Sequence, residues 1–309
     1  MQNNRFLKVD EALKKVAARL SATSLHNLMH EPERSQFIYQ FEDLTVDCTR
    51  QLIDENGMMT LLRLAENCQL QTRIAEMFSG APVNTTEHRP VTHVAVRTPD
   101  HLASVAYQKL SAFAESVRCN PEITTVVNLG IGGSDLGPQM VTQALAGYHD
   151  GPACHFVGNI CPTDLHDVLV TCDPRKTLFI VTSKSFNTVE TLSNAMMAKR
   201  WLGQHGVDVG TAMVAVTAAR ARAEEWGIDP DHIFAFANGI GGRYSLWSPV
   251  GLSVMIAIGS ENFSRLLAGA YAMDRHVQHA DLPQNIGVIM GLLRIWCRRY
   301  LKLPAYGLI

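Results

Sequence analysis

Five short, mainly apolar runs separated by helix-like segments constrain the fold of this chain more than any other feature. The runs cover residues 124–129, 154–157, 177–182, 212–217 and 232–236. Nearly continuous apolar runs of four to six residues are typical of strands that are buried on both faces. When helices connect such strands, the strands lie parallel in one sheet. The sequence therefore predicts an α/β fold with a doubly wound, five-stranded parallel sheet.

The segments around these runs have apolar residues at helical spacing. Between the strands we expect helices over 136–145, 162–170, 189–201 and 218–226. Before them we expect helices over 9–20, 58–70 and 101–118 and a short extended segment over 91–96, and after them helices over 247–260, 263–277 and 286–301. This pattern predicts a mainly helical part over 1–119, the sheet over 120–245 and helices over 246–309. Two of the last helices, 247–260 and 286–301, are expected to expose an apolar face towards a further domain.

Length and composition limit the class of protein. The 309 residues, 47% of them hydrophobic and 18% charged, allow about two globular domains. With 27 Lys and Arg against 29 Asp and Glu, the net charge of −2 provides no general attraction to nucleic acid or to an anionic membrane. No signal peptide or membrane span is expected, because the longest apolar stretch, about 246–259, is short and interrupted. Seven scattered cysteines favour free thiols in the cytoplasm and no zinc site.

The first motif, residues 128–137 (NLGIGGSDLG), lies where a strand ends and a helix begins. Glycines allow close approach of a ligand to the backbone, and a helix N-terminus offers N–H groups to an anion. A dinucleotide fingerprint is excluded because Asp135 occupies the position of its third glycine, and a Walker A loop is excluded because no Gly-Lys-Ser/Thr follows. The alternative is a tight turn with Ser134 or Asp135 as a helix cap.

The second motif, residues 182–191 (TSKSFNTVET), also follows a strand. Its hydroxyl donors are those of Ser183, Ser185 and Thr188. Asn187 and Glu190 have the spacing of a capping box, so a helix is expected to begin here. Hydroxyls and a helix N-terminus that meet at one point form a cradle for a phosphate monoester. Lys184 strengthens this cradle or is solvated, and the alternative for the whole motif is an ordinary polar cap.

The third motif, residues 238–251 (NGIGGRYSLWSPVG), follows the last strand. Two glycines before Arg243 allow its guanidinium to approach a ligand. A guanidinium stays charged at neutral pH, so it stabilises negative charge instead of exchanging protons. The alternative is a structural arginine that closes a loop. Because all three motifs follow strands of one parallel sheet, we expect Ser134 and the second motif to face one cleft, with Arg243 at its rim.

Taken together, GIGGSDLGP, SKSFNTVET and GGRYSLWSPVG closely resemble the glucose-6-phosphate isomerase (phosphoglucose isomerase) family, and the upstream residues 84–97 resemble its NxTExRxVxHxAxR stretch. The resemblance covers nearly the whole chain. It implies a sugar-isomerase (SIS) domain at the predicted sheet. It also implies an aldose–ketose isomerase of glycolysis and gluconeogenesis, which interconverts glucose 6-phosphate and fructose 6-phosphate through an enediolate. A homodimer, with no cofactor and no metal, is implied as well.

The resemblance also implies roles for individual residues. Gly133 and Ser134 border the sugar phosphate, and Arg243 stabilises the enediolate. The implied phosphate loop consists of Ser183, Lys184, Ser185 and Thr188. Ser185 stands where the family usually has threonine, which keeps the hydroxyl. Residues 236–240 lack the tryptophan and the acidic residue that relatives commonly carry there.

The catalytic glutamate of the family lies in a Glu-Ser-x-Gly-Lys stretch that this sequence lacks, and its ring-opening histidine and C-terminal lysine have no match either. Glu261, His276 and His279 are expected to be surface residues and not substitutes. We therefore expect the N-terminal part of an isomerase, without its second SIS domain and inactive by itself. The alternative is a non-catalytic SIS-type module that binds sugar phosphates or regulates a partner.

Overall fold

The computed structural model describes residues 2–30 and 32–305, which belong to two compact units. One unit is formed by Met1–His88 with Ala272–Ile309, and the other by Arg89–Tyr271. Each unit has its own hydrophobic core. Helices and a hairpin form the core of the first unit, and a parallel sheet with helices forms that of the second. The three-part division at residues 119 and 245 stays a prediction about the domains.

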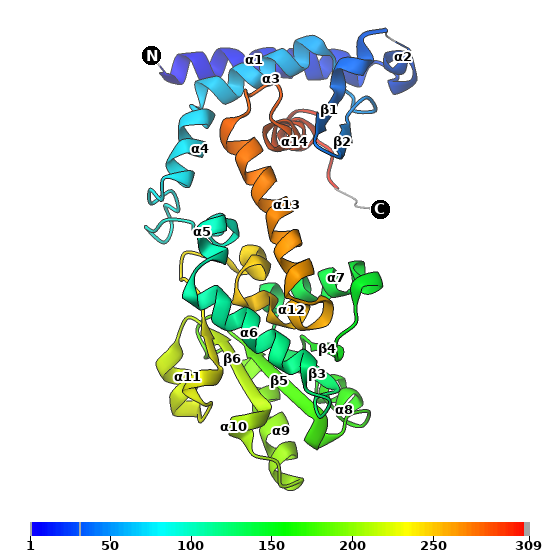
Figure 1. Cartoon of the computed structure of the whole chain (residues 1–309). Coiled ribbons are helices and arrows are strands. Elements are labelled where there is room, and N and C mark those ends of the chain that lie inside the picture. The colour runs from blue at the N-terminus through cyan, green and yellow to red at the C-terminus, as the bar shows by residue number, and fades with distance from the viewer. Residues whose placement is uncertain (1, 31, 306–309) are drawn as a thin grey trace. The chain divides into compact units, whose positions relative to one another are not determined.

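The unit Arg89–Tyr271 contains the predicted sheet (Figure 1). Its strands are β3 (Thr125–Leu129), β4 (Ala153–Val157), β5 (Thr177–Thr182), β6 (Met213–Thr217) and β7 (Ile233–Ala235). Its helices are α5 (Pro99–Leu102), α6 (Val105–Cys119), α7 (Leu136–Ala144), α8 (Pro162–Leu169), α9 (Val189–Gln204), α10 (Val209–Ala212), α11 (Arg220–Trp226), α12 (Leu252–Ile258) and the first part of α13 (Ser260–His279). All neighbouring strands pair in parallel, so the predicted α/β fold with a five-stranded parallel sheet is confirmed.

The order of the strands, β4-β3-β5-β6-β7, identifies the point where a ligand crevice is expected. From β3 the chain moves to one side to form β4 and then crosses to the other side to form β5. Such a reversal leaves a crevice at the carboxyl ends of the two strands on either side of it, here β3 and β5, where ligands bind in open α/β sheets. The first and second motifs directly follow β3 and β5, so both lie where this crevice is expected.

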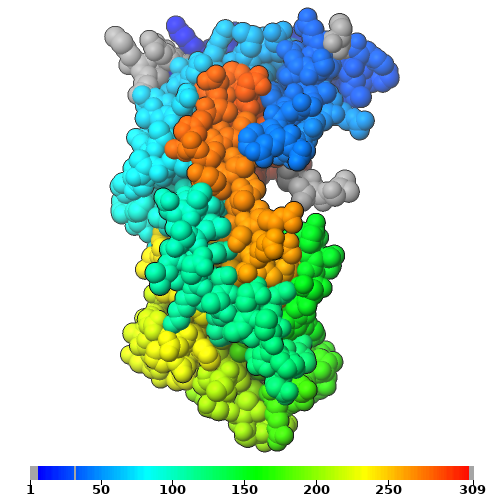
Figure 2. Space-filling view, in the orientation of Figure 1, coloured from blue at the N-terminus to red at the C-terminus, as the bar shows by residue number. Residues whose placement is uncertain are grey.

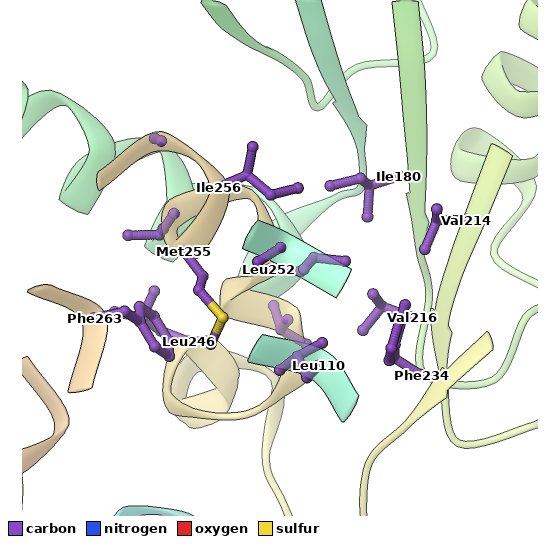
Figure 3. Close-up of a cluster of buried hydrophobic side chains, with 14 of the residues drawn as sticks. Leu110, Ile180, Val214, Val216, Phe234, Leu246, Leu252, Met255, Ile256 and Phe263 are labelled. Carbon is purple, nitrogen blue, oxygen red and sulfur yellow. The ribbon is translucent and has the colours of Figure 1, made fainter. Parts of the chain in front are cut away.

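Helices cover both faces of the sheet. On one face, side chains of β5, β6 and β7 pack against α6, α12 and the start of α13, as Ile180, Val216, Leu110, Leu252 and Phe263 show (Figure 3). In Figure 2, α6 (teal) forms part of the outer surface over this face. The other face packs mainly on α8, α9 and α11. Every residue of α12 is buried, so the expected exposed face over 247–260 is wrong: these side chains complete the core of their own unit.

The predicted extended segment over 91–96 is also wrong. The chain turns there, because Ala95 N–H donates to Thr92 O at 3.1 Å and a 3₁₀ helix follows over Ala95–Arg97. Thr92 N–H donates instead to Gly239 O at 3.1 Å, so the segment packs on the third motif. Arg97 is buried, with its guanidinium carbon 5.1 Å from the centre of the Trp247 ring.

The other unit is built from helices around a short hairpin. Its helices are α1 (Gln2–Ser21), α2 (Leu25–Met29), α3 (Glu55–Asn67), α4 (Leu70–Phe78), the end of α13 and α14 (Ile286–Ile295), which continues as a π-helix over Trp296–Tyr300. The hairpin consists of β1 (Ile38–Phe41) and β2 (Leu44–Asp47), in a region for which the sequence predicted mainly helices. Trp296 is fully buried in the core, and its Nε1 donates to Leu52 O at 2.8 Å.

A buried carboxylate, that of Asp10, links α1 to the π-helix of this unit. It pairs with Lys14 Nζ at 2.6 Å and Arg299 Nη2 at 3.1 Å and accepts a hydrogen bond from Tyr300 Oη at 2.9 Å. The hydrogen bond from Lys14, followed by those from Tyr300 and Arg299, lowers the pKa of Asp10 to about 2, against the opposing effect of burial. Asp10 therefore stabilises the folded unit in its ionised form.

Candidate functional site

The first loop of the site, residues 130–135, makes a tight turn between β3 and α7. Gly132 has a φ of +60°, and Asp135 N–H donates to Gly132 O at 3.1 Å. The turn folds back so far that a Cβ on Gly130 would lie 2.7 Å from Ser134 O. The Ser134 carbonyl points inward and accepts a hydrogen bond from Asn128 Nδ2 at 3.0 Å. The glycines are therefore required by the compactness of the turn.

The alternative for this loop, a tight turn with a helix cap, is met only in the turn, because Asp135 forms no side-chain cap. Asp135 is the N-cap residue of α7, but its side chain makes no cap hydrogen bond. The carboxylate is buried against Gly158 at the end of β4, and its Oδ1 has no hydrogen-bond partner among the described residues. Burial, and then the nearby Asp164, raise the pKa of Asp135.

The second loop, residues 183–188, brings hydroxyl groups to the N-terminus of α9. Ser183 Oγ and Thr188 Oγ1 are 3.0 Å apart. Phe186 is buried and has a φ of +46°, which turns the chain tightly between them. The predicted capping box is wrong, because the N-cap residue is Thr188, without a side-chain cap bond. Asn187 instead accepts a hydrogen bond from Ser185. The first N–H groups of α9 thus lack the usual side-chain acceptor at the N-cap.

Lys184 connects the second loop to the third. Its Nζ donates to Asn238 O at 2.6 Å and to Ile240 O at 2.9 Å, so the ammonium is not simply solvated. Its backbone carbonyl accepts hydrogen bonds from Ala218 N at 3.0 Å and Thr217 Oγ1 at 3.2 Å. Both ends of this residue are therefore held, one by β6 and the turn after it and the other by the third loop.

The third loop, residues 238–247, contacts the first loop backbone to backbone. A Cβ on Gly133 would lie 2.0 Å from Gly242 O and 2.8 Å from Arg243 N. Ser245 Oγ donates to Gly242 O at 2.6 Å and lies 3.4 Å from Gly133 O. This contact leaves no room for a side chain at position 133, which explains the glycine there.

Arg243 lies on the exposed surface of the third loop. Its guanidinium carbon is 5.1 Å from the centre of the Tyr244 ring, which in turn stacks on His93 at 5.1 Å and 28°. Burial, and then the charge of Arg97, lower the pKa of His93, which keeps the imidazole neutral at pH 7. No carboxylate of residues 2–30 and 32–305 pairs with Arg243, so its charge is available to an anion.

The three loops therefore form one connected structure at the carboxyl edge of the sheet. The sequence missed the residues that connect them, chiefly Asn128, Thr182 and Ser245. The sequence did contain one signal for Asn128, because it is a polar residue among apolar residues near the end of a predicted strand. Arg243 is adjacent to the first loop through its backbone, and its side chain is at the surface.

Other polar residues have structural partners or lie apart. His276 Nε2 accepts a hydrogen bond from Ile286 N–H at 3.0 Å, at the start of α14, which explains this histidine without catalysis. Within the described ranges, no three His, Cys, Asp or Glu side chains are grouped to hold a metal ion. Nor does any helix in those ranges combine the length and apolarity that a bilayer crossing requires.

The fold and the site define an open parallel α/β domain whose three polar loops lie at the carboxyl edge of the sheet, where the strand order reverses and such domains bind ligands. The sequence model of phosphoglucose isomerase matches residues 47–309, and the chain belongs to the phosphoglucose isomerase family. The resemblance seen in the motifs is thereby confirmed.

Named relatives agree with this assignment. Glucose-6-phosphate isomerase of Ruegeria sp. (strain TM1040) is 43% identical over 274 residues, which are 82% of this chain and 51% of that protein. The enzyme of Roseobacter denitrificans is 39% identical over 305 residues, 94% of this chain and 57% of that protein. The crystal structure of a glucose-6-phosphate isomerase from Chlamydia trachomatis superposes with a TM-score of 0.84 at 27% identity, over 96% of this chain and 60% of that one. The chain thus spans little more than half the length of these relatives.

Proposed function

We propose that this chain is the sugar-phosphate-binding part of a glucose-6-phosphate isomerase, which interconverts glucose 6-phosphate and fructose 6-phosphate through an enediolate. The observation that carries the proposal is the joining of three loops at one sheet edge in a member of this family. Backbone contact joins the first and third loops, and Lys184 joins the second and third. The substrate in this proposal is inferred from the relatives named glucose-6-phosphate isomerase.

In this proposal the phosphate is bound at the second loop, next to Gly133 and Ser134. Ser183, Ser185 and Thr188 supply hydroxyl donors, and the uncapped N-terminus of the 16-residue helix α9 supplies N–H groups and a partial positive charge. Lys184 contributes its backbone N–H to the ligand, since its ammonium already bonds two carbonyl groups of the third loop. The positive charge of that ammonium still favours an anion nearby.

Arg243 has the second role, which is electrostatic. Isomerisation moves a proton between C1 and C2 of the open sugar, and the enediolate between these states carries negative charge. A guanidinium beside the crevice stabilises that charge without accepting or donating a proton. The base that moves the proton would be the glutamate of the family's Glu-Ser-x-Gly-Lys stretch, which the 309 residues do not contain. A homodimer belongs to the same proposal.

The test therefore measures ligand binding and catalytic turnover separately. The purified 309-residue chain, free of host isomerase, should bind fructose 6-phosphate but show no appreciable conversion to glucose 6-phosphate. A longer protein that includes the glutamate stretch should do both. Removing one member of a cooperating catalytic set costs orders of magnitude in rate, while binding groups elsewhere are unchanged.

Two outcomes would contradict the proposal. Turnover by the 309-residue chain at the rate of a longer relative would show that one of its own residues supplies the base. A longer protein that binds sugar phosphates without turning them over would favour the non-catalytic module. Ser183→Ala combined with Thr188→Val should abolish binding, and Thr142→Val, at a buried threonine of the same unit outside the three loops, is the control.

A further inference from the structure

We propose that Asn128 is a positioning residue that fixes the first and second loops relative to one another. Its amide is the direct link between the turn after β3 and the end of β5. This inference rests on the proposed function, because it assigns Asn128 a part in sugar-phosphate binding without contact with the ligand.

The place of Asn128 in the sheet is unusual for a polar residue. It is the fourth residue of β3, between two parallel neighbours, and pairs with Phe156 of β4 and Ile180 of β5. Its side chain is 0% exposed. By the alternation of a strand it shares a face with Val126, whose side chain belongs to the core between the sheet and α6 and α12. An apolar residue would suit that core better, so a buried amide here requires another explanation.

Both ends of the amide are used, and each reaches a different loop. Nδ2 donates to Ser134 O at 3.0 Å, and Oδ1 accepts a hydrogen bond from Thr182 Oγ1 at 3.1 Å. Ser134 is the residue expected beside the phosphate in the first loop, and Thr182 directly precedes Ser183 in the second. Thr182 is also fully buried, so water does not compete for this pair. One side chain thereby fixes a carbonyl of one loop and the root of the other.

The two links have a consequence for the ligand. Fixing the Ser134 carbonyl holds in place the folded-back turn that carries Gly133 and Ser134. Fixing Thr182 holds the strand end from which Ser183 projects. Hydrogen bonds to a phosphate require donors at set positions. A loop that is already ordered before binding loses no further conformational freedom when the ligand binds. A purely structural role, in contrast, would change stability and leave the affinity of the folded protein unaltered.

The experiment compares Asn128→Leu and Thr182→Val with Thr142→Val. Leucine has nearly the shape of asparagine but no amide, and Thr182→Val removes only the hydroxyl. Thr142 is a buried threonine on α7 whose Oγ1 has no partner among the described residues, so its replacement removes no such link. The affinity for fructose 6-phosphate is measured by calorimetry, and the fraction folded by circular dichroism on the same samples.

We expect Asn128→Leu and Thr182→Val to weaken binding at least tenfold in the folded protein, and Thr142→Val to leave it within twofold. Asn128→Asp adds a pH test: the ionised carboxylate repels the Ser134 carbonyl, and the protonated one donates to it. The ratio of its affinity to the wild-type affinity at the same pH should therefore increase as the pH is lowered from 8 to 5. Wild-type affinity in folded Thr182→Val would overturn the inference, even if Asn128→Leu fails to fold.

Amide hydrogen exchange separates this inference from the proposed function. If the wild-type chain does not bind fructose 6-phosphate, the proposed function fails, but the link itself remains testable. Thr182→Val should then still accelerate exchange in residues 131–135 and 183–188 relative to Thr142→Val. Equal exchange in these two variants would overturn the link.

Discussion

Replacing Gly133 by alanine tests the backbone contact between the first and third loops. The added Cβ would lie 2.0 Å from Gly242 O, and Cβ contacts below 3.0 Å are essentially not seen. One of the two loops must therefore move by about 1 Å. The three nearest neighbours of the new methyl group, Gly242 O, Gly242 C and Arg243 N, are all backbone atoms, so no flexible side chain can rotate away.

The expected cost follows from this geometry. Forcing an extra carbon into a packed contact costs about 1–3 kcal/mol of folding stability. A displacement of about 1 Å in a site can reduce its performance by roughly a hundredfold. We expect Gly133→Ala to lower the free energy of unfolding by about 1–3 kcal/mol and to weaken binding of fructose 6-phosphate by about tenfold to a hundredfold. Urea denaturation and calorimetry measure the two quantities.

Gly203→Ala is the matched control. Gly203 lies in the last turn of α9, is exposed, and has no atom within 4 Å of an added Cβ. Because alanine favours helix over glycine, stability should stay the same or rise by up to about 1 kcal/mol, with unchanged affinity. Gly242→Ala should also preserve stability, since its own Cβ would enter open space. Equal stability and equal affinity in Gly133→Ala and Gly203→Ala would refute the contact.

Three further predictions concern charged residues. Lys184→Met should accelerate amide exchange in residues 238–247, measured by mass spectrometry, because two of their carbonyls lose a donor. In a longer, active protein, Arg243→Ala should lower kcat by a larger factor than it raises KM, since the arginine acts on charge that develops during reaction. Asp10→Asn should lower stability at pH 7 by about 1–2 kcal/mol, measured by urea denaturation. Since the folded pKa of about 2 lies below the ordinary 3.8, this difference should shrink as pH falls from about 4 to 2.

The sheet could be predicted because its strands are buried on both faces. Residues 177–182 read TLFIVT, a run whose every residue is buried, so the sequence pattern and the burial agree. The loops could be predicted because they directly follow such runs. The hairpin of β1 and β2 could not, since each strand has four residues and Tyr39 is the only buried residue of the two strands. A sequence pattern of only four residues cannot be distinguished from the sequence of a turn.

The links inside the site depend on contacts that local sequence does not encode. Lys184 bonds carbonyls 54 and 56 residues away, and Thr182 bonds Asn128 at a separation of 54. The capping-box spacing of Asn187 and Glu190 was misleading because Asn187 bonds Ser185 and the helix begins after Thr188. Residues at the carboxyl end of the sheet make hydrogen bonds within the site, so rules for local helix capping do not predict their partners.

The central claim is that the three loops together bind one sugar phosphate, and an amide NMR titration of the 309-residue chain tests it most directly. Fructose 6-phosphate should shift the resonances of residues 130–135, 183–188 and 238–247, whereas fructose, which lacks the phosphate, should shift none at the same concentration. Phosphate should compete for the second loop alone. The account is contradicted if fructose 6-phosphate leaves these loops unshifted, or if its shifts centre on the aromatic cavity of about 550 Å³ beside β7, lined by Tyr107, Phe234 and Trp247.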